Sequence, residues 1–316
     1  MSRDHQPADG RPAGHHGHSH GVSATADARY LGIALGLILA FMLAEVVVAL
    51  LAGSLVLLAD AGHMLTDALA IGLSLWAIRL AARPATHTWT FGLKRAEILS
   101  AAGNGATLAV VAVLIALDSI RRLVDPPAVA GGAVLAVALA GVAVNLLAAA
   151  VLARANRTSL NVEGSFQHIV TDLYAFIGTA VAGLVILLTG FDRADSIASL
   201  VVVGLMLRAG WLLLRESGRI LLQGTPQDLD LTQIRQHLLE VDHVLSVHDL
   251  HAWSVSSGLP SLSAHIVVAD DCFHDGHVPR LLDEIQHCLA GHFDVEHSTF
   301  QLEPRSHVDH ESGAHA

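Results

Sequence analysis

Two short stretches of this chain place a histidine and an aspartate four residues apart inside apolar sequence. GHMLTDALAIG contains His63 and Asp67, and QHIVTDLYAFIG contains His168 and Asp172. Residues i and i+4 of an α-helix lie on the same face, so each pair forms half of a site on one helix. Together the halves offer two imidazole nitrogens and two carboxylate oxygens, a tetrahedral donor set that suits Zn²⁺. The pairs therefore predict one metal site built from two helices.

The alternative for each pair is a hydrogen-bonded link between helices that binds no metal. Ionisable residues at membrane depth cost about 2.5–3.5 kcal/mol each on insertion scales, and they usually line a transport pathway. The occurrence of two matching pairs in separate apolar segments favours the metal site. Thr66 and Thr171 directly precede the aspartates, and they are expected either to orient these ligands or to bond their own helix backbone.

The composition indicates a membrane protein. The chain has 316 residues, of which 53% are hydrophobic and 15% charged, whereas soluble domains carry about 25% charged residues. The net charge of −11 argues against nucleic acid as a partner. A helix needs about 20 mostly apolar residues to cross a lipid bilayer. Six segments meet this requirement, at 29–52, 56–82, 97–120, 128–153, 164–190 and 195–221.

The basic residues of the short loops predict the orientation in the membrane. With the N-terminus inside, nine arginines and lysines lie at the cytoplasmic ends of the segments and three at the outer ends. Positive residues concentrate on the cytoplasmic side of membrane proteins. We therefore expect a multi-pass protein of a bacterial inner membrane with both termini in the cytoplasm.

The chain divides into four regions. Residues 1–27 form a polar, histidine-rich tail that we expect to be disordered and cytoplasmic, and 28–223 form a transmembrane domain with six helices. Residues 224–305 alternate as helix, strand, strand, helix and strand, which predicts a small α+β domain with the order αββαβ. The last region, 306–316, is expected to be a disordered tail. The two cysteines, Cys272 and Cys288, are too few for a disulfide framework.

A metal site of this kind also implies proton chemistry. A metal ion displaces protons from its ligands, so its binding depends on pH, and a histidine titrates near pH 6.5 unless it is perturbed. A mid-membrane site that faces the two sides in turn would exchange metal for H⁺, as secondary carriers do.

The sequence resembles the cation diffusion facilitators, a family of six-helix metal/proton antiporters with a ferredoxin-like cytoplasmic domain. The segments that carry the resemblance are GSLVLLADAGHMLTDALAIG, TFGLKRAEILSA, HIVTD, ADSIASL, VHDLHAW and STFQLE. The His-Asp/His-Asp combination is similar to that of the zinc-selective branch. The resemblance implies a homodimer that exports Zn²⁺, and also Cd²⁺ or Co²⁺, without an organic cofactor.

The resemblance also implies two accessory sets of metal ligands. The family places regulatory ligands on the strands of its cytoplasmic domain, at positions that match His248, His265 and Glu303, while Gln301 stands where some relatives have histidine. Many relatives carry a long histidine-rich loop between the fourth and fifth helices, whereas the loop here is the short NRTSLNVEG. The tail histidines could collect metal in its place, or serve no transport role; they are His15, His16, His18 and His20.

Rival functions could use the same kinds of residue. An intramembrane metalloprotease needs an HExxH motif, which this sequence lacks, and a site with four protein ligands leaves no open position for the water that catalytic zinc requires. We therefore expect a transporter rather than an enzyme. A membrane metal sensor or a structural zinc protein could use the same residues, and only a transporter would move the ion across a bilayer.

Overall fold

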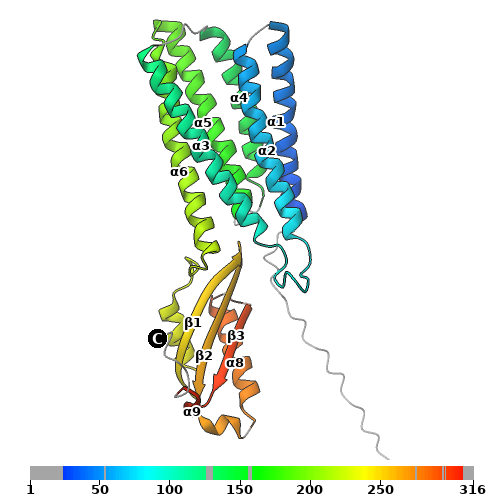
Figure 1. Ribbon diagram of the computed structural model, residues 1–316, viewed down its shortest axis with the longest axis vertical. Coiled ribbons are helices and arrows are strands. Elements are labelled where there is room, and N and C mark those ends of the chain that lie inside the picture. The colour runs from blue at the N-terminus through cyan, green and yellow to red at the C-terminus, as the bar shows by residue number, and fades with distance from the viewer. Residues whose placement is uncertain are drawn as a thin grey trace, which may run out of the picture.

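The chain folds into a helical bundle followed by a small domain that contains a sheet (Figure 1). This computed structural model describes residues 24–52, 55–125, 131–155, 159–274, 276–293, 295 and 297–308. Within these ranges the description leaves out the side chains of 24–26, 48–49, 51–52, 55–63, 66, 131, 133–134 and 290–292, and that of His63 is among them. The tail histidines that the sequence singled out also lie outside the described residues.

Six long helices run side by side in the described part of the bundle (Figure 1). They are α1 (Ala24–Ala52), α2 (Leu55–Ala81), α3 (Ala96–Val124), α4 (Gly131–Leu152), α5 (Leu160–Thr189) and α6 (Arg193–Leu221). Among the described residues, five helices contain a stretch long and apolar enough to cross a membrane, namely all of these except α2. The first helix begins inside the segment that the sequence assigns to the tail.

The outside of the bundle is apolar, as expected of a surface that faces lipid. Large apolar side chains with more than half of their surface exposed occur on several helices, among them Leu69, Trp76, Val110, Leu188 and Trp211. In water, apolar surface of this extent would promote aggregation. In a bilayer the backbone polar groups of the helices are already paired, so the same surface is stable.

The six helices pack as two groups. One apolar core is formed by α1, α2, α4 and α5, with Leu31, Ile71 and Ile169 completely buried. A second core joins α3 to α6. These two helices approach closely because Gly105 faces Gly210, and a Cβ built on Gly210 would lie 2.8 Å from the Gly105 carbonyl oxygen.

The α3–α6 contact gives a first prediction. Gly210→Ala forces the two helices apart, and overpacking of this kind costs about 1–3 kcal/mol. We expect a thermal unfolding midpoint several degrees below that of the wild type in detergent. Gly204→Ala on the same helix is the control, since nothing in the described part of the chain lies within 4 Å of its Cβ. Equal midpoints for the two variants would contradict this account of the packing.

The start of α5 differs from the sequence prediction. The polar stretch NRTSLNVEG was expected to be a loop, with the helix starting near residue 164, but α5 begins at Leu160. Ser159 occupies the N-cap position and Glu163 lies in the first turn, where a negative charge stabilises a helix. These two residues were the sequence signal for a helix that starts at residue 160. The extra turn brings Asn161 into the buried part of the bundle.

The C-terminal domain has the predicted order of helices and strands. It contains α7 (Leu231–Leu239), β1 (Val244–Ser256), β2 (Leu259–Val268), η1 (Asp270–Phe273), α8 (Val278–Phe293), β3 (His297–Glu303) and α9 (Arg305–Val308). The strands form a three-stranded sheet in the order β1-β2-β3, antiparallel between β1 and β2 and parallel between β2 and β3. One apolar core joins α7 and α8 to the sheet.

The turn between β1 and β2 contacts the helical bundle. The Ser257 N–H donates to Glu97 Oε1 at the start of α3, at 3.0 Å, and the Ser257 hydroxyl accepts from the Leu160 N–H at 3.0 Å. These bonds place the first turns of α3 and α5 at the end of the bundle next to the C-terminal domain (Figure 1). The helix that carries His168 and Asp172 is therefore in direct contact with that domain.

Candidate metal centres

The first candidate centre lies between α2 and α5, inside the bundle. His168 and Asp172 are one turn apart on α5, and α2 brings Asp67 against them. The His168 Nε2 atom lies 2.7 Å from Asp67 Oδ1 and 3.8 Å from Asp172 Oδ2. All three side chains are buried, with exposed fractions of 5% for Asp67, 4% for His168 and 8% for Asp172. Two helices thus bring together two carboxylates and an imidazole in a site shielded from solvent.

This geometry is suited to a divalent cation. One ligand atom from each of the three residues can be chosen so that all lie within 4.8 Å of one another. A metal ion at their centre would neutralise two carboxylates that otherwise repel each other at low dielectric. The fourth predicted ligand, His63, lies on α2 one turn before Asp67, and its side chain is outside the described part of the structure.

A cavity of about 100 Å³ adjoins this centre. Its walls include both aspartates together with Met64, Phe176 and Thr179. The last two residues follow Asp172 along α5, so the cavity extends from the aspartates away from the C-terminal domain. The cavity thus borders the site on the side away from the C-terminal domain.

Two other polar residues of the bundle bond to the backbone of their own helices, and a third is buried. The Thr171 hydroxyl donates to the Gln167 carbonyl in its own helix, at 2.7 Å, which is the backbone-bonding alternative predicted for it. Asn145 donates to the carbonyl of Gly141 on its own helix, at 3.1 Å, and lines the cavity. Glu45 is buried on α1.

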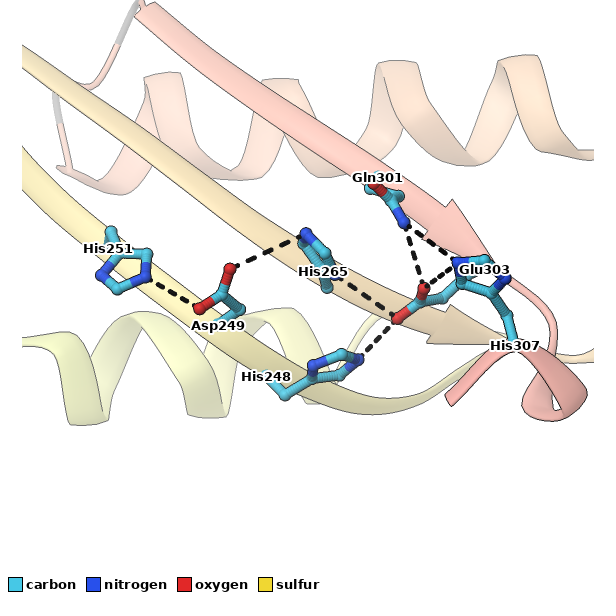
Figure 2. A network of polar contacts seen from close by, with 7 residues as sticks. All are labelled: His248, Asp249, His251, His265, Gln301, Glu303 and His307. Carbon is cyan, nitrogen blue, oxygen red and sulfur yellow. Dashed lines mark hydrogen bonds and ion pairs between the residues drawn. The ribbon is translucent and has the colours of Figure 1, made fainter. Parts of the chain in front are cut away.

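The second candidate centre lies on the sheet of the C-terminal domain (Figure 2). His248 on β1 is paired with His265 on β2, and Glu303 ends β3. The His248 Nε2 atom lies 2.5 Å from Glu303 Oε1, and His265 Nδ1 lies 3.8 Å from the same oxygen. The Glu303 carboxylate is 2% exposed. Ligand atoms of these three residues also fall within 4.8 Å of one another, so the strands bring together the trio named from the family resemblance.

Sequence reasoning missed two members of this cluster. In a regular strand Asp249 would face away from its neighbour His248, but β1 has an irregularity between His248 and His251, and Asp249 has a positive φ of 49°. The bulge turns the Asp249 carboxylate toward His265, 3.8 Å away, as Figure 2 shows. His307 was assigned to a frayed tail, yet α9 brings its Nε2 atom to 3.7 Å from Glu303 Oε2.

Further polar residues of this domain lie around the trio or apart from it. The Gln301 amide donates to Glu303 Oε2 at 3.3 Å, so it orients that carboxylate. His251 contacts Asp249 at 2.9 Å. The ring of His277 packs against His243, and that of His297 against Phe91. His277 and His297 therefore take part in packing contacts away from the cluster.

Both cysteines are free thiols. Cys272 is buried in the apolar core of the domain, and Cys288 is partly buried on α8. Burial, together with the nearby Glu240 carboxylate, raises the pKa of the Cys288 thiol. A thiol with a raised pKa is a poor nucleophile and metal ligand at neutral pH.

Both parts of the chain match a known protein family. Residues 31–222 match the cation efflux transmembrane domain, and residues 226–305 match the cation efflux protein cytoplasmic domain. The chain therefore belongs to the cation diffusion facilitator family of metal efflux transporters, as the motifs indicated. It is a membrane protein whose C-terminal domain is the family's cytoplasmic domain.

Several relatives are similar over nearly their whole length. The zinc transporter ZitB of Escherichia coli is 40% identical over 293 residues, which cover 91% of this chain and 92% of the relative. The cadmium, cobalt and zinc/H(+)-K(+) antiporter of Bacillus velezensis is 36% identical, with 92% and 93% covered. The metal cation efflux system protein CzcD of Cupriavidus metallidurans is 38% identical, with 91% and 90% covered. These relatives are transporters rather than enzymes, as expected.

One solved structure is also similar, the metal-bound C-terminal domain of the CzcD transporter from Cupriavidus metallidurans. It is 35% identical, and the match covers 24% of this chain and 99% of that structure, with a TM-score of 0.22.

Proposed function

We propose that this protein exports Zn²⁺ from the cytoplasm in exchange for protons, with the ion held by His63, Asp67, His168 and Asp172. The observation that carries this proposal is the buried contact between the His168 imidazole and the Asp67 carboxylate, with Asp172 beside them. Nitrogen and oxygen donors together suit the borderline Zn²⁺ ion better than Mg²⁺ or Ca²⁺, which prefer oxygen alone.

The same residues supply a route for proton exchange. When the ion leaves, His168 and the two aspartates are left as an imidazole facing two carboxylates in a site of low dielectric. Protonation of the imidazole partly neutralises that charge, so departure of the metal favours uptake of a proton. The same ligands thus bind either the metal or H⁺, which is the basis for coupling the two fluxes.

The substrate range follows from the donor set and from the relatives. The names of the relatives include zinc, cadmium and cobalt, and all three ions accept imidazole and carboxylate ligands. We infer that Zn²⁺ is the main substrate and that Cd²⁺ and Co²⁺ also pass.

The proposed topology has six membrane-spanning helices. We add helix α2 to the five helices identified above, since it lies beside α1 in the bundle (Figure 1) and carries half of the ligands. The protein lies in a bacterial inner membrane, with both termini in the cytoplasm. We further propose that residues 28–223 form the transmembrane domain and residues 224–305 a ferredoxin-like domain through which two copies form a homodimer. Helix α1 extends the first domain back to Ala24, and α9 continues the second to Val308.

The cluster of His248, His265 and Glu303 is proposed as a regulatory Zn²⁺ site. The contact of Ser257 with Leu160 joins this domain to α5 and so to the transport ligands. The histidines of the N-terminal tail, His15, His16, His18 and His20, are proposed to collect scarce metal for transport.

Replacement of His248 tests the regulatory site. In an Asp172→Asn background, which disables the transport site, we expect His248→Ala to weaken zinc binding by the full-length protein about 10–100-fold. Equilibrium dialysis against zinc gives the affinity. His237→Ala is the control, because this half-buried histidine bonds the Gln233 carbonyl of its own helix and lies outside the cluster. An affinity unaffected by His248→Ala would exclude that ligand.

Transport is tested in sealed vesicles that contain the purified protein and a trapped zinc-sensitive dye. An antiporter accumulates zinc steadily when the vesicle interior is acidic, and an ionophore that collapses the pH gradient stops the uptake. A sensor or a structural zinc protein binds its ions once and moves none. Uptake that ignores the pH gradient would refute proton exchange.

A further inference from the structure

Four polar side chains form a second buried cluster in the bundle, apart from the proposed ligands. Ser74 lies on α2, Asn104 on α3, and Asn161 and Ser165 on α5. Their exposed fractions are 0%, 2%, 0% and 1%, respectively. We call these four residues the polar cluster. Buried hydroxyls and amides are costly unless they are hydrogen-bonded, so their placement inside a membrane bundle calls for a reason.

The residues of the polar cluster bond to one another, with Ser74 at the centre. Its hydroxyl accepts from the Asn104 amide at 3.2 Å and from the Ser165 hydroxyl at 2.9 Å, and its carbonyl accepts from the Asn161 amide at 2.9 Å. The Asn161 Oδ1 atom is buried and has no hydrogen-bond partner among the described residues. This oxygen remains available to accept a bond from water.

The polar cluster lies on one side of the transport ligands and the cavity on the other. Along α5, Asn161 and Ser165 come before His168 and so lie nearer the C-terminal domain, which contacts Leu160. Along α2, which runs in the opposite direction, Ser74 follows Asp67. The cavity extends the other way, toward Phe176 and Thr179. The ligands are thus next to open space on one side and to a closed, hydrogen-bonded layer on the other.

The polar cluster also joins the two packing groups of helices. Asn104 belongs to the α3–α6 pair, whereas its partner Ser74 belongs to the group of α1, α2, α4 and α5. Gly164 of α5 lies at this junction, where a Cβ would be in ordinary van der Waals contact with the Asn104 amide nitrogen and with Leu213, both 3.6 Å away. Any movement of one group against the other at this end of the bundle has to break the Asn104–Ser74 bond.

We propose that the polar cluster is the gate on the C-terminal-domain side of the transport path, closed in this structure. When it opens, the freed hydroxyls and amides line a polar route to Asp67 and His168, and Asn161 Oδ1 offers a further oxygen to the water around an arriving cation. A layer of leucines would seal the path equally well but would present no polar groups on opening. This inference rests on the proposed function, because it assumes a path through the ligand site.

The gate is tested by cysteine accessibility in vesicles. Cys272→Ala and Cys288→Ser remove the native thiols, and a single reporter is introduced either at the gate, Gly164→Cys, or in the cavity, Thr179→Cys. A water-soluble maleimide then labels each reporter with and without Ser74→Ala, which removes the central hydroxyl. Ser217→Ala is the control, since its buried hydroxyl on α6 has no hydrogen-bond partner among the described residues.

Loss of one or two hydrogen bonds shifts an equilibrium between two states about three- to tenfold. We expect Ser74→Ala to raise labelling of Gly164→Cys by this factor and to lower labelling of Thr179→Cys, while Ser217→Ala changes neither. Unchanged rates, or a rise at both reporters, would overturn the gate and leave the cluster as a structural link. If Ser74→Ala does not fold, Ser165→Ala removes one of the same bonds and carries the test.

Labelling needs neither metal nor a pH gradient, so its outcome is separable from the proposed function. Opposite changes at the two reporters in a protein that moves no zinc would refute the antiporter and keep the conformational change. Zinc transport without such changes would refute the gate alone.

Discussion

Asp172→Asn is expected to reduce zinc uptake to the level of vesicles without protein, a loss of more than about 100-fold. The substitution keeps the shape of the side chain but removes one of the two carboxylate charges described at the buried centre. An ion with two positive charges is then held at low dielectric by one carboxylate, which leaves a net charge that is costly to bury. The amide is also a weaker ligand for Zn²⁺ than a carboxylate.

Initial rates of zinc uptake under a fixed pH gradient measure this effect. Asp118→Asn is the matched control, because it removes the same charge from an exposed residue of α3 that pairs with Arg122 at 2.7 Å. We expect the control to transport at the wild-type rate. Uptake by Asp172→Asn within threefold of the wild type would exclude Asp172 as a ligand.

His168→Asp is expected to change the selectivity of the site. An aspartate there would replace the described imidazole with an oxygen donor and place three carboxylates around the ion. Carboxylate sites suit Mn²⁺, whereas imidazole favours Zn²⁺. We therefore expect zinc uptake to fall at least about tenfold, and manganese to become a competing substrate.

Competition between the two metals in the same vesicles measures this change. The variant should take up manganese at a rate well above that of the wild type, and excess manganese should inhibit its remaining zinc uptake. His87→Asp is the control, since His87 lies in an exposed loop after α2. A variant that keeps the zinc preference of the wild type would show that the His168 imidazole does not set selectivity.

Sequence periodicity predicted the pairing of His168 with Asp172, because the rise of a helix fixes which residues share a face. The periodicity also indicated that the second apolar segment would face these residues, since ionisable side chains without partners are costly in lipid. The structure places Asp67 against His168, as that reasoning required.

Other features depend on local backbone geometry that the apolar pattern does not predict. Asp249 joins its cluster only because β1 is irregular there and the residue adopts a positive φ. Asn161 looked like part of a loop because polar residues surround it, yet α5 starts one turn earlier than its apolar pattern suggests. For Asp249 no residue type marks the bulge, whereas for Asn161 the N-cap residue Ser159 and the first-turn Glu163 carried a signal that the apolar pattern lacked.

The central claim, that zinc and protons use one site in turn, is tested most directly by recording both fluxes in the same vesicles. A zinc-sensitive dye and a pH-sensitive dye are trapped inside vesicles that hold either the wild type or Asp67→Asn. The account predicts that zinc influx into wild-type vesicles is accompanied by proton efflux in a fixed ratio, and that both fluxes disappear together in the variant. Zinc influx that persists in Asp67→Asn, or that proceeds in the wild type without proton movement, would contradict it.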